Sequence, residues 1–330
     1  MATRADTGGQ ASRASGVLGA VRERPILVLC GLLVLLVVGL DVARPGMVGP
    51  GWISNTILFA APLGIVAAGQ TLVMLTGGID LSVATVMTAA AYVAASQSSF
   101  GTTRAVLLAL LIGLVVGLIN GLGVAVFQVQ PLIMTLGMGL VVAGVLLVYS
   151  LAAVRGGPPQ VPDVVRFAGS DKLFGLIPVS LIPWGIVAVV ILVGLRRTGF
   201  GRLLYAVGDN PLACRLAGVR VWTVLLTVYV IAGFLSAVAG LLLVGATNAA
   251  DLSLGNVYLL PSIAAVVIGG TSIYGGQGGY GGTIVGALML TVLNSLFTVL
   301  DAPDPVKQVL YGAVVLLLAA AYVRAASDQG

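Results

Sequence analysis

The sequence predicts an all-α polytopic membrane protein that crosses the bilayer about ten times. Of its 330 residues, 59% are hydrophobic and only 8% are charged, and the mean hydropathy is +1.13. A soluble domain carries about 25% charged residues, so this chain has too little polar surface to face water on all sides. The composition therefore indicates a protein embedded in a lipid bilayer.

Apolar segments of the expected length recur along the whole chain. They lie at about 26–40, 55–75, 81–95, 104–127, 131–154, 183–195, 222–246, 257–268, 282–300 and 306–323. The third, sixth and eighth are short for a hydrocarbon core of roughly 30 Å, which indicates broken or re-entrant helices that line a cavity. Pro62 and Pro261 fall inside spans, where we expect them to kink the helix.

The basic residues are unevenly distributed between the two sides of the membrane. With ten spans, both termini and the loop 196–221 lie on one side, and that side holds ten of the 16 basic residues. The positive-inside rule then predicts cytoplasmic termini and a cytoplasmic loop. We expect a disordered tail over 1–25, one transmembrane domain over 26–323 and a short tail over 324–330. The net charge of +5 reflects this asymmetry and does not indicate nucleic-acid binding.

The polar loop between the sixth and seventh spans contains the signature of a short capped helix. Asn210 suits the N-cap position, and Pro211 suits the first helical position. Gly218 can adopt the left-handed conformation that ends a helix. Leu212 and Leu216 are four residues apart and share a face. A helix of about seven residues is not stable in water alone, so it must pack against the membrane domain or another protein.

A second polar motif, Gly77-Gly78-Ile79-Asp80-Leu81-Ser82, separates the second and third spans. A carboxylate next to apolar spans on both sides is by default a functional-site hypothesis. The alternative is that Asp80 caps a helix that begins at Leu81, while the glycines turn the chain. We favour this structural role.

A glycine-rich stretch beginning Gly269-Gly270-Thr271 follows the eighth span. A phosphate-binding loop would need a preceding strand and a following lysine, and this stretch has neither. Close helix packing and a flexible backbone near a transport pathway remain as alternatives. Asn120 and Asn294 lie inside spans, where hydrogen bonding between helices is favoured over contact with a solute.

An internal repeat is a further hypothesis. Residues 74–80 and 267–272 both run from apolar residues through two glycines to polar residues. If the second span corresponds to the seventh, the odd shift of five spans would invert one half relative to the other.

Four motifs in order carry a resemblance to a known family. They are GQTLVMLTGGIDLSVA (69–84), VQPLIMTLGM (129–138), RTGFGRLLYAVGDNPLACRLAGV (197–219) and AAVVIGGTSIYGGQGGYGGTIVGALML (264–290). Together they resemble the permease subunits of bacterial ribose/xylose/galactose-type ABC importers. The resemblance implies a multi-pass protein of the inner membrane that pairs with a second permease copy, receives solute from an extracytoplasmic binding protein and is driven by a cytoplasmic ATPase.

By the same resemblance, the polar loop would be the coupling helix that docks on the ATPase. The residues concerned are Asp209, Asn210, Pro211, Leu212, Ala213, Arg215, Leu216 and Gly218. The family often has Gly-Asn-Glu-Ala-Ala where this chain has Asp209-Asn210-Pro211-Leu212-Ala213. Proline fits the first helical turn, so the helix is kept, but a charge contact from that position is put in doubt.

Other functions fit the sequence less well. We expect no enzyme activity, no metal and no bound cofactor in this chain, and ATP would be used by the partner subunit. A chain with two cysteines and no histidine offers no metal-binding spacing. An ion-coupled carrier would need several ionisable residues within the membrane, and Asp80 is the one candidate. Import of branched-chain amino acids or nucleosides remains the alternative to sugar import.

Overall fold

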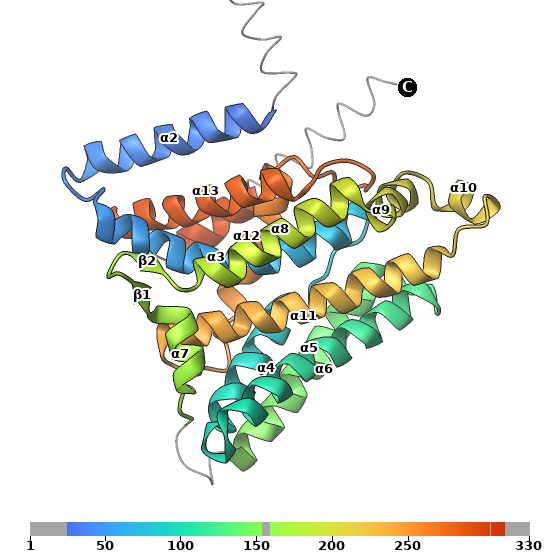
Figure 1. Cartoon of the computed structure of the whole chain (residues 1–330), viewed down its shortest axis with the longest axis horizontal. Helices are drawn as coiled ribbons and strands as arrows, with labels where there is room; N and C mark the ends of the chain where they lie inside the picture. Colours follow the sequence, from blue (N-terminus) through green and yellow to red (C-terminus); the bar gives the residue numbers. More distant parts are fainter. Residues whose placement is uncertain (1–24, 154–158, 304, 314–330) are drawn as a thin grey trace, which may run out of the picture.

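The computed structural model describes residues 25–153, 159–303 and 305–313, and these form a helical domain (Figure 1). The membrane-domain helices are α2 (Pro25–Ala43), α3 (Pro50–Leu75), α4 (Val83–Ser96), α5 (Thr102–Ala125), α6 (Pro131–Ala153), α8 (Leu181–Arg197), α11 (Val221–Thr247), α12 (Leu259–Ile268) and α13 (Tyr280–Val299). Smaller elements are η1 (Ser98–Phe100), α7 (Asp163–Ser170), α9 (Gly199–Asp209), α10 (Pro211–Leu216) and η3 (Asn256–Tyr258). The predicted tails and residues 314–323 of the tenth span lie outside the described residues.

The lengths of these helices confirm an all-α membrane domain with some broken spans. Among the described residues, six helices are long and apolar enough to cross a bilayer, namely α2, α3, α5, α6, α11 and α13. Helices α8 and α9 form a pair bent by 72°. Two of the three segments predicted to be short are the shorter apolar helices α4, with 14 residues, and α12, with 10. Pro261 does not lie in the middle of a helix, where a proline would cause the predicted kink. It lies in the first turn of α12, where no intrahelical hydrogen bond is lost.

Helix α3 lies at the centre of the domain and α2 at its edge. Nearly all of α3 after its first turns is buried, whereas α2 exposes most of its apolar side chains. Helix α11 packs on α3, α4 and α5. A methyl group placed on Gly113 of α5 would lie 2.3 Å from the Gly233 carbonyl oxygen of α11. Such close approach of small residues is the usual way in which helices associate in membranes.

The two ends of the domain carry different structures (Figure 1). Helix α10 projects at one end, beyond α9 and the start of α11. At the opposite end lie α7 and a hairpin of β1 (Lys172–Leu173) and β2 (Ile177–Pro178), which pair antiparallel. The C-terminal end of α3 and the N-terminal end of α11 both lie near α10, so these two helices run in opposite directions.

The spacing of elements along the chain bears on the internal repeat, which stays a prediction. From Pro50, the start of α3, to Val221, the start of α11, the shift is 171 residues, and the same shift relates Asp80 to Asp251. Both aspartates precede Leu-Ser and precede a short helical segment. This common shift agrees with a correspondence between the second span and the seventh. The glycine motif at 267–272 follows the eighth span, so its pairing with 74–80 does not share this shift.

The two Asp-Leu-Ser turns have the same hydrogen bonds in different environments. Asp80 Oδ1 accepts from the Ser82 backbone N–H at 2.8 Å and from Ser82 Oγ at 2.6 Å. Asp251 Oδ1 accepts from the Ser253 backbone N–H at 2.7 Å and also from Ser253 Oγ. Asp80 is only 1% exposed, whereas Asp251 lies on the surface.

Candidate functional site at the α10 end

The structure forms the capped helix that the polar loop predicts. The Asn210 side chain accepts a hydrogen bond from the Ala213 backbone N–H at 2.9 Å. Pro211 is the first helical residue, and Gly218 has a φ of +83°, in the left-handed region. The helix itself has six residues, because Ala217 already occupies the C-cap. Capping at both ends compensates for the small number of internal hydrogen bonds.

The two faces of α10 differ in exposure. Cys214 is 8% exposed and packs into the main apolar core of the domain. Leu212 and Leu216 lie on the other face, where they are 65% and 83% exposed. The membrane domain therefore holds α10 through Cys214 and leaves both leucines uncovered in the described part of the chain.

Helix α9 joins α10 to the end of the central helix. A methyl group placed on Gly208 would lie 1.9 Å from the Leu75 carbonyl oxygen, so only glycine allows this approach. The same oxygen accepts a hydrogen bond from the Gly276 backbone N–H at 3.0 Å. Tyr205 of α9 donates to the Gly278 carbonyl oxygen at 2.9 Å. The end of α3, the glycine-rich loop 269–279 and α9 therefore meet at one point, which we call the Leu75 junction.

Asp80 has a different local role from the predicted one. Helix α4 begins at Val83, two residues later than expected, and Ser82 occupies its N-cap position without a side-chain cap bond. Asp80 instead accepts both hydrogen bonds from Ser82 in a buried turn. A short acidic side chain before a helix suits either arrangement, which explains why the helix start was placed too early.

Side chains from three helices hold this turn in place. Asn120 of α5 donates from Nδ2 to Ser82 Oγ at 2.9 Å, as the predicted role of an interhelical amide requires. Thr135 of α6 accepts from the Leu81 backbone N–H at 3.0 Å. Gln70 of α3, with its amide oriented to satisfy both groups, donates to the Asp80 carbonyl oxygen at 3.2 Å and accepts from the Asp80 N–H at 3.3 Å. Non-helical backbone within a membrane domain needs such internal partners.

The glycine pairs of both motifs are sites of close packing. Gly77 and Gly270 have φ values of +78° and +85°. A methyl group would lie 2.7 Å from the Tyr229 hydroxyl at Gly78, and 2.4 Å from the Thr283 backbone nitrogen at Gly269. Thr271, which is fully buried, accepts from the Gly279 N–H at 3.3 Å. Glycine is thus required for turning or packing at all four positions.

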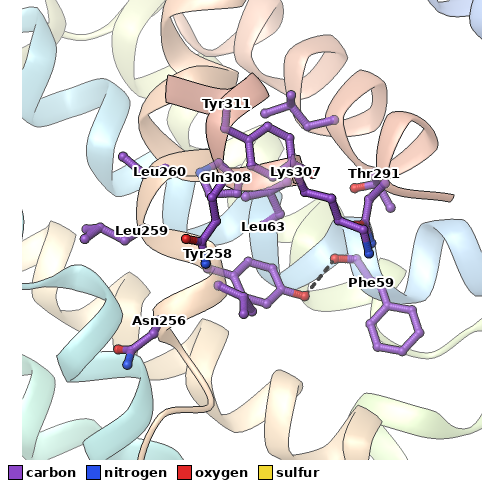
Figure 2. Close-up of a pocket in the computed structure, with 14 residues that line it drawn as sticks. Phe59, Leu63, Asn256, Tyr258, Leu259, Leu260, Thr291, Lys307, Gln308 and Tyr311 are labelled. Atoms are coloured by element: carbon purple, nitrogen blue, oxygen red, sulfur yellow. Dashed lines mark hydrogen bonds between the residues drawn. The ribbon is translucent and has the colours of Figure 1, made fainter. Parts of the chain in front are cut away.

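Asn294 lies apart from the Asp80 turn and from the glycine-rich loop. It lines a cavity of about 410 Å³ between α3, α12, α13 and the helical residues 305–313 (Figure 2).

The sequence reasoning missed four residues of the site. Gln70 and Thr135 hold the Asp80 turn, and Gly208 and Gly276 form the Leu75 junction. A glutamine in the middle of an apolar segment was a usable signal in the sequence for Gln70. The others become recognisable only once their partners are known.

The buried turn leads to a first testable prediction. Asp80→Asn keeps the Oδ1 acceptor, so folded yield and transport should stay close to those of the parent chain. Asp80→Leu removes both bonds in a buried site and should cost roughly 1–3 kcal/mol, seen as a lower melting temperature in detergent. Asp251→Leu is the matched control, because the same two bonds are lost at a surface where water replaces them. Loss of transport by a fully folded Asp80→Asn protein would show that the charge itself has a function.

The broken spans, the buried non-helical turns and the projecting helix are typical of polytopic transport proteins. Residues 52–319 match a family described as branched-chain amino acid transport system / permease component, and the chain therefore belongs to this permease family. Together with the sugar-import relatives below, this match confirms the resemblance that the four sequence motifs indicated. A multi-pass membrane protein of a transport system, rather than an enzyme, is the class to which it belongs.

Several curated proteins are similar over most of the chain. The ribose import permease protein RbsC of Bacillus subtilis is 36% identical over 297 residues, covering 87% of this chain and 89% of that protein. RbsC of Escherichia coli K12 is 38% identical over 258 residues, covering 77% and 80%. The fructose import permease protein FrcC of Rhizobium meliloti is 35% identical over 271 residues, covering 79% and 74%. No solved structure matches the chain.

Proposed function

We propose that this chain is the membrane-spanning permease subunit of an ATP-driven importer for a sugar or a similar small polar solute. The observation that carries the proposal is the exposed pair Leu212 and Leu216 on α10, a helix fixed through α9 to the Leu75 junction. An apolar pair on a short polar helix suits docking into a groove of a partner. The named similarity to ribose and fructose import permeases favours a sugar over a branched-chain amino acid or a nucleoside.

The partners follow from the same proposal. A cytoplasmic ATPase would bind α10, an extracytoplasmic binding protein would deliver the solute at the end with α7 and the β1–β2 hairpin, and a second permease copy would complete the pathway. ATP would be bound and used by the ATPase alone. This arrangement requires the α10 end and both termini to be cytoplasmic, in agreement with the excess of basic residues on that side.

The Leu75 junction suggests how a movement at α10 would reach the membrane. Gly208 leaves no gap between α9 and the Leu75 carbonyl oxygen, so a displacement of α9 is expected to displace the end of α3. The same oxygen is bonded to Gly276, in the loop that leads into α13. A movement of the ATPase would in this way reach both the turn before α4 and the loop before α13.

The proposal predicts that transport needs a partner ATPase. The chain should be purified from native membranes in mild detergent, and the proteins that remain bound should be identified and reconstituted with it. Proteoliposomes with the whole assembly should accumulate radiolabelled sugar only with internal ATP, whereas the chain alone should accumulate none. Accumulation by the chain alone, driven by a proton or sodium gradient, would establish an ion-coupled carrier and contradict the proposal.

A further inference from the structure

The cavity beside Asn294 lies in the half of the domain remote from α10. Phe59 and Leu63 of α3 border it, and Leu63 precedes Leu75 by twelve residues, or about 18 Å along a helix. Its volume of about 410 Å³ lies within the range of about 300–1,000 Å³ that is typical of small-molecule sites. Figure 2 shows Tyr258, Thr291, Lys307 and Gln308 around the same space.

The lining of this cavity is unusually polar for a membrane domain. Asn256, Tyr258, Thr291, Asn294 and Gln308 all contribute to it, together with Lys307. The Tyr258 hydroxyl donates to the Phe59 carbonyl oxygen at 3.5 Å. A second cavity of about 490 Å³ between α4, α5 and α6 is bordered mainly by aliphatic side chains, and Gln97, Arg104 and Tyr149 are its polar lining residues. Asn256, Asn294 and Gln308 are exposed, so the first cavity opens to the surface. Polar side chains in a membrane domain are costly unless they face water or a polar ligand, so the first cavity suits a polar solute better than the second cavity does.

We propose that this cavity is a transit site for a neutral polyhydroxylated solute, with Thr291 and Asn294 of α13 as contacts for its hydroxyl groups. The inference rests on the proposed import function and deepens it by naming a solute site. Amide and hydroxyl side chains both donate and accept hydrogen bonds, as a sugar does. The ring of Tyr258 offers an apolar face for the carbon skeleton.

The lining also discriminates against amino acids. A free amino acid carries an ammonium group, which inside a membrane needs a carboxylate or several acceptors around it. Among the described residues, no aspartate or glutamate borders the cavity. The ammonium group of a branched-chain amino acid would therefore lose its hydration here without a compensating negative charge. A sugar would exchange its hydrogen bonds with water for hydrogen bonds with amides and hydroxyls.

Uptake by the reconstituted assembly tests the inference with matched variants on one helix. Asn294→Leu keeps the size of the side chain and removes its amide, and it should lower the uptake rate of D-ribose or D-fructose about tenfold at low concentration. Asn294→Gln should restore most of the rate. Ser295→Ala changes the neighbouring residue, which does not border the cavity, and should stay within about twofold of the parent. Gel filtration should show each variant as a folded assembly.

A second measurement does not depend on transport. A cysteine at Thr291 should react with a membrane-impermeant maleimide added from the outside, with the parent chain, which contains only Cys30 and Cys214, as the blank. Saturating D-ribose or D-fructose should slow this reaction severalfold, and L-leucine should not. Protection of the cysteine by the transported sugar supports the inference even if Asn294→Leu fails to fold.

The possible failures are distinguishable. Uptake of L-leucine but of neither sugar by the parent assembly would overturn the proposed function and the inference with it. Sugar uptake that is equal in Asn294→Leu and Ser295→Ala, without protection of the cysteine at Thr291, would overturn the transit site and leave the sugar importer in place.

Discussion

Leu216→Asp should abolish ATP-driven uptake and leave a normally folded permease. Leu216 is 83% exposed, so the membrane domain does not depend on it, and a charge at this position stays in water in the isolated chain. In the assembly we expect the side chain to enter a groove of the ATPase. Burial of a leucine contributes roughly 1.5–3 kcal/mol, and burial of an unpaired carboxylate costs more than that.

These two free energies set the expected loss of affinity between the permease and the ATPase. Loss of the leucine alone should weaken the ATPase complex about tenfold to a hundredfold, and the buried charge should weaken it further. Gel filtration in detergent measures folding, and pull-down of the purified ATPase measures association. Leu216→Met is the matched control, because it keeps an apolar side chain of similar volume. Association and uptake at the parent level by Leu216→Asp would show that α10 is not the docking helix.

Gly208→Ala should uncouple ATP hydrolysis from uptake rather than prevent docking. The new methyl group would lie 1.9 Å from the Leu75 carbonyl oxygen and 2.6 Å from the Gly276 nitrogen. Both are backbone atoms, which cannot move aside as the end of a flexible side chain can. Helix α9 must shift, and the Leu75 junction must open. Leu212 and Leu216 are unchanged, so the ATPase should still bind and hydrolyse ATP while uptake falls at least tenfold.

The sign of the stability change makes this test decisive. Alanine is favoured over glycine inside a helix by up to about 1 kcal/mol, so without the steric conflict Gly208→Ala would stabilise the protein. Overpacking typically costs about 1–3 kcal/mol, and we expect a lower melting temperature. Gly199→Ala is the control in the same helix, because its nearest new neighbour is the end of the Arg202 side chain at 3.9 Å. A stabilised, fully coupled Gly208→Ala protein would contradict the role of the junction.

The parts of the fold that depend on local pattern were predictable from the sequence. Apolar length identified the membrane helices, including the short third and eighth spans, and the caps at Asn210 and Gly218 identified α10. These signals lie within a few neighbouring residues. The family was likewise recognisable, because its four motifs occur in order along most of the chain.

The parts that depend on distant partners were not predictable in the same way. The contact of Gly208 with Leu75 and Gly276 unites three segments that are far apart in the sequence, and nothing local distinguishes these residues. The repeat was inferred from glycine pairs, which are common in membrane helices, whereas the Asp-Leu-Ser turns at Asp80 and Asp251 share both their sequence and their hydrogen bonds. The cavity at Asn294 requires the placement of three helices relative to α3.

The backbone contacts between α5 and α11 have a mechanical consequence. Methyl groups on Gly113 and Gly233 would each lie within about 2.3 Å of the other residue's carbonyl oxygen, and a methyl on Gly117 would lie 2.4 Å from the Tyr229 carbonyl oxygen. Surfaces fitted so closely can neither rotate nor slide past one another without collision. The two helices should therefore travel through the transport cycle as one rigid body, and the hinges should lie in the loops that flank it.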